Sequence, residues 1–339
     1  MSYIQDIGTA VPKHSLSQEE FAKVYSSLTE ESDIQRKIKF LTARSSINKR
    51  HSVEPNIKKL VATSLEDKLA TYHTNALELA EEAVINNPAY SNNKENITDI
   101  IFVSCTGMQA PGVEIDLIQR LRLSNRISRY NINFMGCYAS LTALRMAKGI
   151  CASPKRIVLI VSVELCTLHF QQQFTDDYLL SNSIFADGAA SAIVTSEKHD
   201  AKIQLTDFES RLLPTSKEEM SWKISPSGFL MTLSAEVPKT ISKSLKDKNL
   251  FNLRPNTIGW AIHPGGKQII DGIKTTLDLD ESELTASRKV LQENGNMSSA
   301  TILFVLEEKL KNSTTSKEEF IACAFGPGLT LESALMKYV

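Results

Sequence analysis

Three residues of this chain have side chains suited to acyl-transfer chemistry, and each lies at the end of an apolar run or loop. Cys137 lies in NINFMGCYASLTALRMAKGI, where a strand-like run ends at Phe134 and a helix-like stretch begins near Tyr138. The sulfur would lie at the positive end of a helix, where oriented N–H groups favour the nucleophilic thiolate. The alternative is a buried packing cysteine, the usual state of a free thiol.

The other two residues are His263 in WAIHPGGKQIID and Asn296 in LQENGNMSSATILFVLEE. Alone, each would be read as a capping or turn residue. Together with Cys137 they form a chemical set, because His can hold a thiolate as an ion pair and Asn supplies a neutral N–H donor. The set predicts an acyl thioester on Cys137, with an oxyanion or enolate held by His263 and Asn296. Papain-like hydrolases use the same residue types, but their Cys lies near the mature N-terminus in a different local sequence.

Composition excludes several classes of protein. The chain has 339 residues, 42% hydrophobic and 23% charged, which is ordinary for a globular protein of one large α/β unit or two domains. Its net charge of −1 indicates no nucleic-acid partner, and its longest apolar run, IVLIVSVEL, is too short to span a membrane. No secretory signal is evident. The five cysteines lack paired or metal-binding spacing, so we expect free thiols in a reducing cytoplasm.

The pattern of apolar residues indicates an α/β fold. Val- and Ile-rich runs predict strands covered on both faces; in the first half they lie at 97–105, 130–134, 156–164 and 189–195. Amphipathic stretches between them predict helices at 69–85, 114–121 and 141–150. The second half repeats the theme, with strands at 204–209, 257–263 and 320–325 and helices at 266–277 and 300–311. We expect the polar stretch 214–228 to be a lid or cavity loop, and 243–253 to be a solvated helix end and loop.

Five motifs occur in the order GCYAS, FADGAAS, HPGG, GNMSSA and FGPGLT. In these motifs the chain resembles the type III polyketide synthases, the chalcone synthase-like family of the thiolase superfamily, nearly from end to end. The resemblance implies a thiolase-like duplicated αβαβα five-layered fold. It implies an N-terminal half, 1–200, that carries the nucleophilic Cys, and a C-terminal half, 201–339, that carries His and Asn. It also implies a homodimer in which the neighbour's loop near Ala110 approaches the cavity.

The resemblance also implies roles for individual residues. Cys137 would take the starter acyl group and then the growing polyketide, while His263 and Asn296 would stabilise the enolate left when malonyl-CoA loses carbon dioxide. Phe185 would be an aromatic gatekeeper that shields the enolate from water. The CoA thioesters are substrates, and no separate cofactor is implied. Three basic residues fall where the family grips CoA phosphates, with a solvated basic surface as the alternative: Arg44, Lys49 and Arg50.

The positions that line the family's cavity depart from the plant pattern. Trp222 falls where plant enzymes keep a glycine, so it should narrow one arm of the cavity, and Met231 replaces an aromatic residue and could reshape another arm. Threonine positions of the family are occupied by Cys105, Cys166 and His169, while Ser298 keeps the family serine and Phe325 lies in the loop that supports the cavity. We therefore do not expect a flavonoid product. His169 is interpreted as a hydrogen-bonded cavity wall or as a second polar catalyst.

The expected activity is that of a type III polyketide synthase. It would load an acyl-CoA or malonyl-CoA starter on Cys137, decarboxylate malonyl-CoA, perform iterative Claisen condensations and cyclise the product to a pyrone, resorcinol or phloroglucinol type. One alternative is a single-condensation ketoacyl synthase of the thiolase superfamily, which the number of malonyl units per product would distinguish. The other is a non-catalytic homologue, which would be favoured only if Cys137 cannot be acylated.

Overall fold

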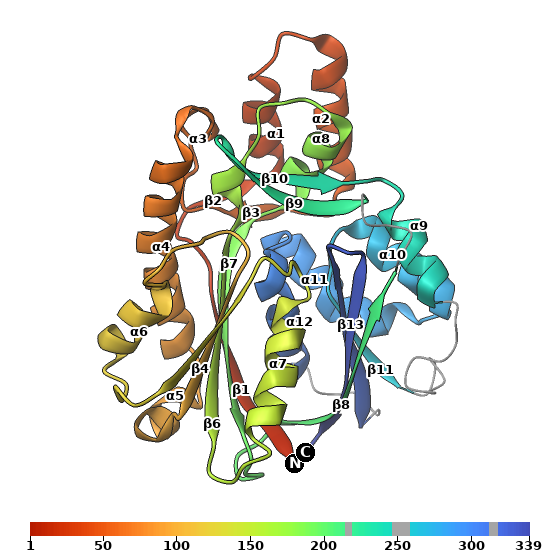
Figure 1. Cartoon of the computed structure of the whole chain (residues 1–339). Coiled ribbons are helices and arrows are strands. Elements are labelled where there is room, and N and C mark those ends of the chain that lie inside the picture. The colour runs from red at the N-terminus through yellow and green to blue at the C-terminus, as the bar shows by residue number, and fades with distance from the viewer. Residues whose placement is uncertain (214–218, 246–257, 312–317) are drawn as a thin grey trace.

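The computed structural model describes residues 1–213, 219–245, 258–311 and 318–339. Its main element is a nine-stranded mixed sheet in the order β11-β12-β13-β8-β1-β7-β6-β4-β5, and the two chain termini lie side by side at one end of it (Figure 1). The strands of the first half are β1 (Ser2–Ala10), β4 (Asp99–Ser104), β5 (Ser128–Asn133), β6 (Ile157–Leu165) and β7 (Asp187–Thr195). Those of the second half are β8 (Ile203–Leu212), β11 (Gly259–Ile262), β12 (Glu319–Gly326) and β13 (Thr330–Tyr338).

Helices cover this sheet, and two short two-stranded antiparallel sheets accompany it. The helices of the first half are α1 (Gln18–Ser26), α2 (Ser32–Arg44), α3 (Ile57–Ala62), α4 (Leu65–Ile85), α5 (Tyr90–Asn93), α6 (Val113–Leu121), α7 (Ala139–Ile150) and α8 (Asp176–Ile184). Those of the second half are α9 (Val237–Leu245), α10 (Lys267–Leu277), α11 (Thr285–Asn294) and α12 (Thr301–Lys311). One of the small sheets pairs β2 (Ser15–Ser17) with β3 (Lys49–His51), which follows α1 and α2 in the chain, and the other is a hairpin of β9 (Met220–Ser225) and β10 (Gly228–Leu233).

Strand pairing repeats between the two halves. In the first half β1 is antiparallel to β7, β7 is antiparallel to β6, and β6 is parallel to β4. In the second half β8 is antiparallel to β13, β13 is antiparallel to β12, and β12 is parallel to β11. A short antiparallel contact between β1 and β8 joins the two patterns. This topology is the duplicated arrangement expected of a thiolase-like fold.

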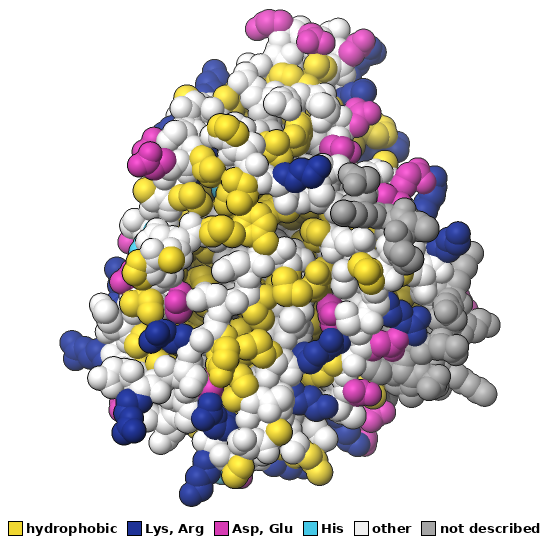
Figure 2. Space-filling model, viewed as in Figure 1, with side chains coloured by type: hydrophobic (Ala, Val, Ile, Leu, Met, Phe, Trp, Pro, Cys, Tyr) yellow, Lys and Arg dark blue, Asp and Glu magenta, His cyan; other side chains and the backbone are white. Residues whose placement is uncertain are grey.

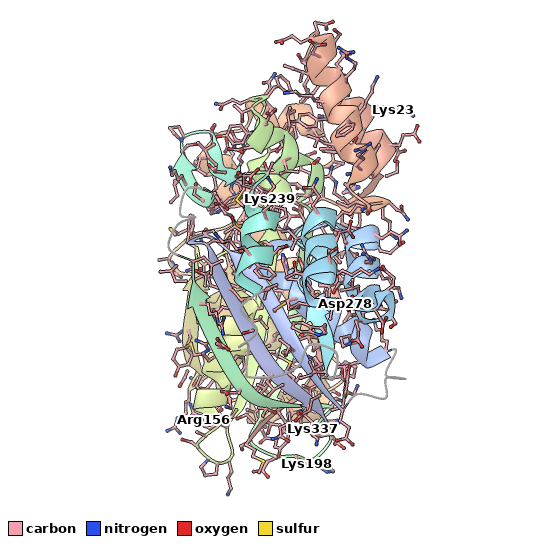
Figure 3. All side chains as sticks on the ribbon, turned by 90° about the vertical axis from the view of Figure 1, so that its right-hand side faces the viewer. Lys23, Arg156, Lys198, Lys239, Asp278 and Lys337 are labelled. Atoms are coloured by element: carbon pink, nitrogen blue, oxygen red, sulfur yellow. The ribbon has the colours of Figure 1, made fainter. Side chains whose placement is uncertain are left out.

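The apolar strands are buried on both faces, and successive side chains belong to different cores. Ile101 and Val103 of β4 face the central core with α7 and α12, whereas Ile100 and Phe102 face an outer core with α4 and α6. Residues of β12 alternate in the same way between the central core and a second outer core that contains α9 and α10. Figure 3 shows α9, which carries Lys239, and α10, which ends before Asp278, covering the second half of the sheet. The layers are therefore helix, strand, helix, strand, helix.

The predicted strands and helices are found within a few residues of their expected ends, with one exception. The segment 214–228, predicted as a lid or cavity loop, is a strand over 220–225 that pairs with β10 and is not a loop there, although its Trp222 does line a cavity beside Cys137. Residues 214–218, 246–253 and 257 of the predicted segments lie outside the described residues. Across the described ranges, none of the helices combines the length and apolar character needed to cross a bilayer.

Candidate active site

Cys137 lies in a tight turn between β5 and α7. Gly136 has φ +91°, and a Cβ there would come within 2.3 Å of Cδ of Pro327, so this position requires glycine. The N–H of Ala139 donates to the carbonyl of Gly136 at 3.0 Å and starts the helix. Cys137 is buried, and its thiol donates a long hydrogen bond of 3.6 Å to Oγ of Ser298. The sulfur thus lies immediately before the first turn of α7, as the sequence predicted.

The protonation state of Cys137 differs from the expectation. Burial raises the pKa of the Cys137 thiol to about 12, and this outweighs the opposing hydrogen bonds from Ser298 and Asn296. The negative charge of Glu164 acts in the same direction as burial. With its pKa raised in this way, the sulfur is a thiol in this structure despite its place at the helix N-terminus.

Asn296 is held so that its amide N–H2 group faces the site. Its Oδ1 accepts from the N–H of Ser298 at 2.9 Å, which leaves Nδ2 to donate to the carbonyl of Gly265 at 3.3 Å. The same side chain is close enough to hydrogen-bond Cys137. Its backbone is paired with the Phe185 segment, because Asn296 N–H donates to Ile184 at 2.9 Å and its carbonyl accepts from Ala186 at 2.9 Å. The structure therefore brings Cys137, Asn296 and the Phe185 segment together.

His263 follows β11, where its N–H donates to the carbonyl of Cys323 at 2.8 Å. It begins the turn whose Gly265 carbonyl accepts from Asn296, so these two predicted residues occupy adjoining segments. The ring is buried, and within the described part of the chain neither ring nitrogen has a hydrogen-bond partner. Burial lowers the pKa of His263 to about 3, so the imidazole is neutral and the expected ion pair with Cys137 is absent from this state. Because buried polar atoms are rarely left unpaired, these nitrogens are available to a ligand.

A cavity of about 20 Å³ adjoins Cys137. That is about enough for one water molecule. Six of the predicted cavity residues line it: Cys105, Phe185, Cys166, Trp222, Met231 and Ser298. Trp222 is fixed in place because its Nε1–H donates to the carbonyl of Cys105 at 2.7 Å.

Two predicted cavity residues lie elsewhere. His169 is placed behind Trp222, with its ring stacked on Phe229 at 4.1 Å between centroids. Its Nε2 donates to the carbonyl of Thr106 at 2.7 Å, and its Nδ1 accepts from the N–H of Phe229 at 3.1 Å. With both nitrogens engaged, His169 supports the wall and is not placed to act as a second catalyst. Phe325 is buried in the outer core of the second half, and Pro327 of the same turn lines the cavity instead.

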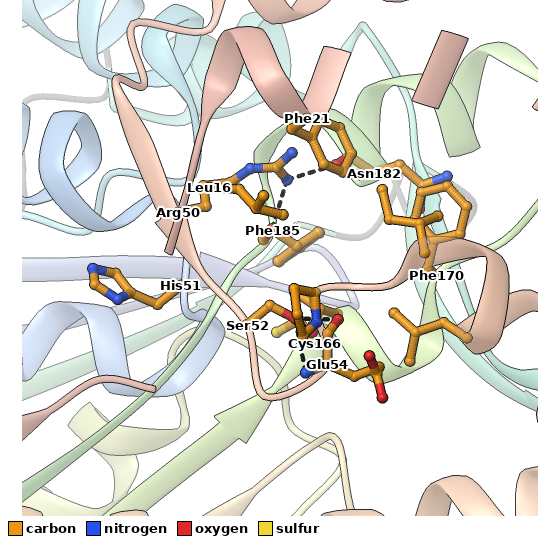
Figure 4. Close-up of a pocket in the computed structure, with 14 residues that line it drawn as sticks. Leu16, Phe21, Arg50, His51, Ser52, Glu54, Cys166, Phe170, Asn182 and Phe185 are labelled. Atoms are coloured by element: carbon orange, nitrogen blue, oxygen red, sulfur yellow. Dashed lines mark hydrogen bonds between the residues drawn. The ribbon is translucent and has the colours of Figure 1, made fainter. Parts of the chain in front are cut away.

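The three predicted CoA-binding residues have different environments. Arg44 lines a pocket of about 200 Å³. Lys49 is exposed and pairs with Glu293 at 3.4 Å. The prediction for Arg50 is not supported by its geometry, because its buried guanidinium turns inward and donates from Nη1 to the carbonyls of Asn182 and Phe185, at 2.7 and 2.8 Å (Figure 4). Arg50 therefore positions the Phe185 segment.

Sequence reasoning missed two residues. Lys267 lines the same pocket as Arg44 and begins α10, and its signal was a basic residue directly after HPGG. Glu164 is fully buried and accepts from the N–H of Cys105, from Oγ1 of Thr106 and from Oγ of Ser299. Burial raises the pKa of its carboxyl. Its signal was a single carboxylate inside an otherwise apolar strand, a placement that requires several hydrogen-bond donors.

Two family models together match nearly the whole chain. Residues 1–198 match the N-terminal domain of chalcone and stilbene synthases, and residues 204–339 match the C-terminal domain. A putative chalcone synthase of Bacillus subtilis is 31% identical, over 100% of this chain and 99% of its own length. A probable polyketide synthase 1 of Dictyostelium discoideum is 29% identical over 100% of this chain, which spans 11% of that longer protein.

Among solved structures, the C-terminal type III polyketide synthase domain of Steely1, a type I/III hybrid from Dictyostelium, superposes with a TM-score of 0.94. It is 29% identical, and the match covers 100% of this chain and 99% of that domain. The pentaketide synthase of Neurospora crassa shares the fold with a TM-score of 0.90 at 24% identity, over 100% of both chains. The chain therefore belongs to the chalcone and stilbene synthase family, the type III polyketide synthases.

Proposed function

We propose that the enzyme loads an acyl-CoA or malonyl-CoA starter on Cys137 and extends it with units derived from malonyl-CoA. The observation that supports this most directly is the environment of Cys137. The buried thiol of Cys137 adjoins a cavity with room for about one water molecule, and the amide of Asn296 is close enough to hydrogen-bond that thiol. His263, on the segment that adjoins Asn296, carries an imidazole with two unpartnered nitrogens. These are the groups needed to form a thioester and to stabilise negative charge on oxygen beside it.

Each step assigns a task to these groups. For loading, the sulfur of Cys137 attacks the carbonyl of the starter thioester, the carbon–sulfur bond to CoA breaks, and the thiol proton passes to the departing CoA sulfur. In extension, the bond between the carboxylate carbon and the methylene carbon of malonyl-CoA breaks, and carbon dioxide leaves. The electron pair of that bond forms the enolate of acetyl-CoA, whose oxygen accepts hydrogen bonds from Asn296 Nδ2 and a ring N–H of His263. The enolate carbon then attacks the Cys137 thioester, the carbon–sulfur bond breaks, and the lengthened chain is left on CoA. Return of the chain to Cys137 allows another round.

The pocket of about 200 Å³ is suited to the pantetheine arm and phosphates of CoA. Arg44 stands at its wall with its guanidinium 4.2 Å over the ring of Phe40. Gly265 and Gly266 line the pocket just before α10, and Lys267, the first residue of α10, adds a positive charge at the helix N-terminus. Free N–H groups and a positive dipole end favour phosphate. Gly265 also accepts from Asn296, so this pocket adjoins the catalytic segment.

The small cavity favours a short product. Trp222 and Met231 occupy the space beside Cys137, and the remaining 20 Å³ cannot hold a folded polyketide without movement of a side chain. This observation also favours the second candidate, a ketoacyl synthase that performs one condensation. The number of malonyl units in the released product distinguishes the two, and the cyclisation to a pyrone, resorcinol or phloroglucinol type follows only from several extensions.

We also propose that the enzyme works as a homodimer in the cytoplasm. Figure 2 shows hydrophobic side chains gathered over the middle of the face on which α7 and the β9–β10 hairpin lie. The loop that carries exposed Ala110 contributes Met108, which is 45% exposed, and α7 contributes the half-buried Met146 and Ile150. An apolar face of this kind is characteristic of a contact with another protein surface. The five buried, unpaired cysteines suit a reducing compartment.

Mass spectrometry of the purified protein with malonyl-CoA and a panel of acyl-CoA starters tests the proposal. We expect an acyl mass on the peptide that contains Cys137 and a polyketide of several malonyl units among the products. Cys137→Ala should abolish both, whereas His263→Ala and Asn296→Ala should lose malonyl decarboxylation. Acylation of other cysteines alone, or wild-type decarboxylation in both of these variants, would contradict the proposed roles.

A further inference from the structure

Lys68, in the first turn of α4, is a buried lysine that the proposed chemistry does not use. Its side chain is 1% exposed, and its Nζ donates to the carbonyl of Ser227 at 2.7 Å. Among the described residues no carboxylate forms an ion pair with it, and burial lowers the pKa of its ammonium group. Since a buried cation without a counter-charge is costly, the stability of the fold does not explain this lysine.

The carbonyl that Lys68 binds belongs to the turn of the β9–β10 hairpin. Figure 1 shows this hairpin lying across one end of the sheet, with its turn near the start of α4. Gly228 in the turn has φ +131°, and a Cβ there would come within 3.3 Å of His169 Nδ1 and 3.4 Å of Lys68 Nζ. Gln171 accepts from Oγ of Ser227 at 3.3 Å. The turn is therefore held closely between α4 and the segment that follows β6.

This turn leads directly into the wall of the catalytic cavity. Phe229, the second residue of β10, is buried, and the edge of one ring meets the other between Phe229 and Trp222, at 6.1 Å between centroids. Across the hairpin Trp222 pairs with Met231, and both side chains line the cavity beside Cys137. A shift of the turn would therefore move the two side chains that narrow the space beside the sulfur.

We propose that Lys68 is a positioning residue, which holds the hairpin turn, keeps Trp222 and Met231 in place and so limits the size of the acyl group that the cavity accepts. This inference rests on the proposed function, because acyl size matters only if Cys137 is acylated. Lys68 lines neither the cavity nor the CoA pocket, so its effect reaches the site through the hairpin. Since Ser227 is exposed, water can replace the lysine at the carbonyl. Loss of the ammonium group should loosen the turn without unfolding the protein.

Lys68→Met removes the donor and leaves a long apolar side chain, and the loading of starters tests its effect. We expect kcat/KM for loading of benzoyl-CoA, relative to that of acetyl-CoA, to rise about tenfold. The melting temperature should stay within about 3 °C of wild type. Lys58→Met, which removes an exposed lysine from neighbouring α3, is the matched control and should change neither quantity. A variant that fails to fold would show that the lysine serves the fold, and an unchanged starter preference in a folded variant would equally overturn the proposal.

The fluorescence of Trp222 reports on the hairpin without any need for activity. The chain has two tryptophans, and Trp260 is 2% exposed, so acrylamide reaches it little. Lys68→Met should raise the acrylamide quenching constant about twofold or more, because a loosened turn exposes Trp222. Lys58→Met should leave the constant unchanged. An unchanged constant in Lys68→Met would mean that the turn is held without the lysine, which refutes the proposal.

A double variant tests whether Lys68 acts through Trp222. If it does, Lys68→Met combined with Trp222→Gly should show a starter preference within about twofold of Trp222→Gly alone. Full additivity of the two changes would place the effect elsewhere and overturn the proposed route. If no CoA thioester acylates Cys137 in the wild type, the proposed function fails. If the wild type is acylated and Lys68→Met matches it in starter preference and in quenching, the role of Lys68 alone fails.

Discussion

Replacement of His169 by Gln tests whether this residue is a wall or a catalyst. His169 is 4% exposed, and its two ring nitrogens bond to the backbone of Thr106 and Phe229. A glutamine can donate to Thr106 and accept from Phe229, but it cannot take up a proton. Since His169 does not line the catalytic cavity, we expect malonyl decarboxylation by His169→Gln within about twofold of wild type at pH 7.5.

The titration of the buried His169 ring sets how much the free energy of unfolding changes with pH. Burial lowers the pKa of His169 from 6.5 to about 4, and the nearby charge of Lys68 acts in the same direction. Above pH 6.5 the folded and unfolded chains both carry the neutral ring. As the pH falls below 6.5, the unfolded chain binds a proton that the folded chain refuses, so stability falls until about pH 4. At pH 5 the loss is about 2 kcal/mol, because each pH unit contributes about 1.4 kcal/mol.

The assay is urea unfolding at pH 7.5 and pH 5.0 for both proteins. Wild type should lose about 2 kcal/mol more than His169→Gln over this interval. The opposite contribution of Asp187, whose pKa burial raises to about 6, and the similar loss from His263 are common to both proteins and cancel in the difference. An identical pH dependence would show that the ring is not held neutral by burial. Loss of decarboxylation in a variant that is stable at pH 7.5 would show that His169 is a catalyst.

Four further substitutions test other parts of the site. Trp222→Gly should remove the Nε1 bond to Cys105 and enlarge the cavity, so chromatography with mass detection should find longer products or bulkier starters; an unchanged product profile would remove Trp222 from the cavity. Arg50→Met should lower unfolding free energy by about 2–4 kcal/mol, because two carbonyls lose a charged donor. By contrast, Arg44→Ala should raise KM for malonyl-CoA with little change in melting temperature. A raised KM in Arg50→Met together with an unchanged KM in Arg44→Ala would instead identify Arg50 as the CoA ligand. Glu164→Gln should cost about 2–4 kcal/mol in urea unfolding, since its amide would face the N–H of Cys105, and wild-type stability would contradict that reading.

Local sequence pattern determined the strands and the positions of the reacting groups along them. Fully apolar runs do not show the alternation of apolar and polar residues that marks a strand with one exposed face. Their length and their Val and Ile content were nevertheless sufficient to predict β4, β6 and β7 as strands covered on both faces. A small or polar residue at the end of such a run reliably marks the place where the chain turns. Cys137 and His263 could therefore be placed at the ends of strands from sequence alone.

Properties that depend on distant segments were decided only by the tertiary structure. Arg50 reads as a surface base in sequence, and it is the packing of α1 and α8 around it that buries its charge and turns it onto two carbonyls. The thiolate expected at Cys137 depends on a local helix end, whereas the pKa of its thiol depends on burial by residues from across the whole chain. Trp222 donates a hydrogen bond to the carbonyl of Cys105, which is more than a hundred residues away in the sequence. The periodicity of a sequence depends on neighbours along the chain, whereas burial and electrostatics depend on neighbours in space. For Arg50, Cys137 and Trp222 the neighbours in space come from distant segments, so the sequence pattern alone did not determine their environment.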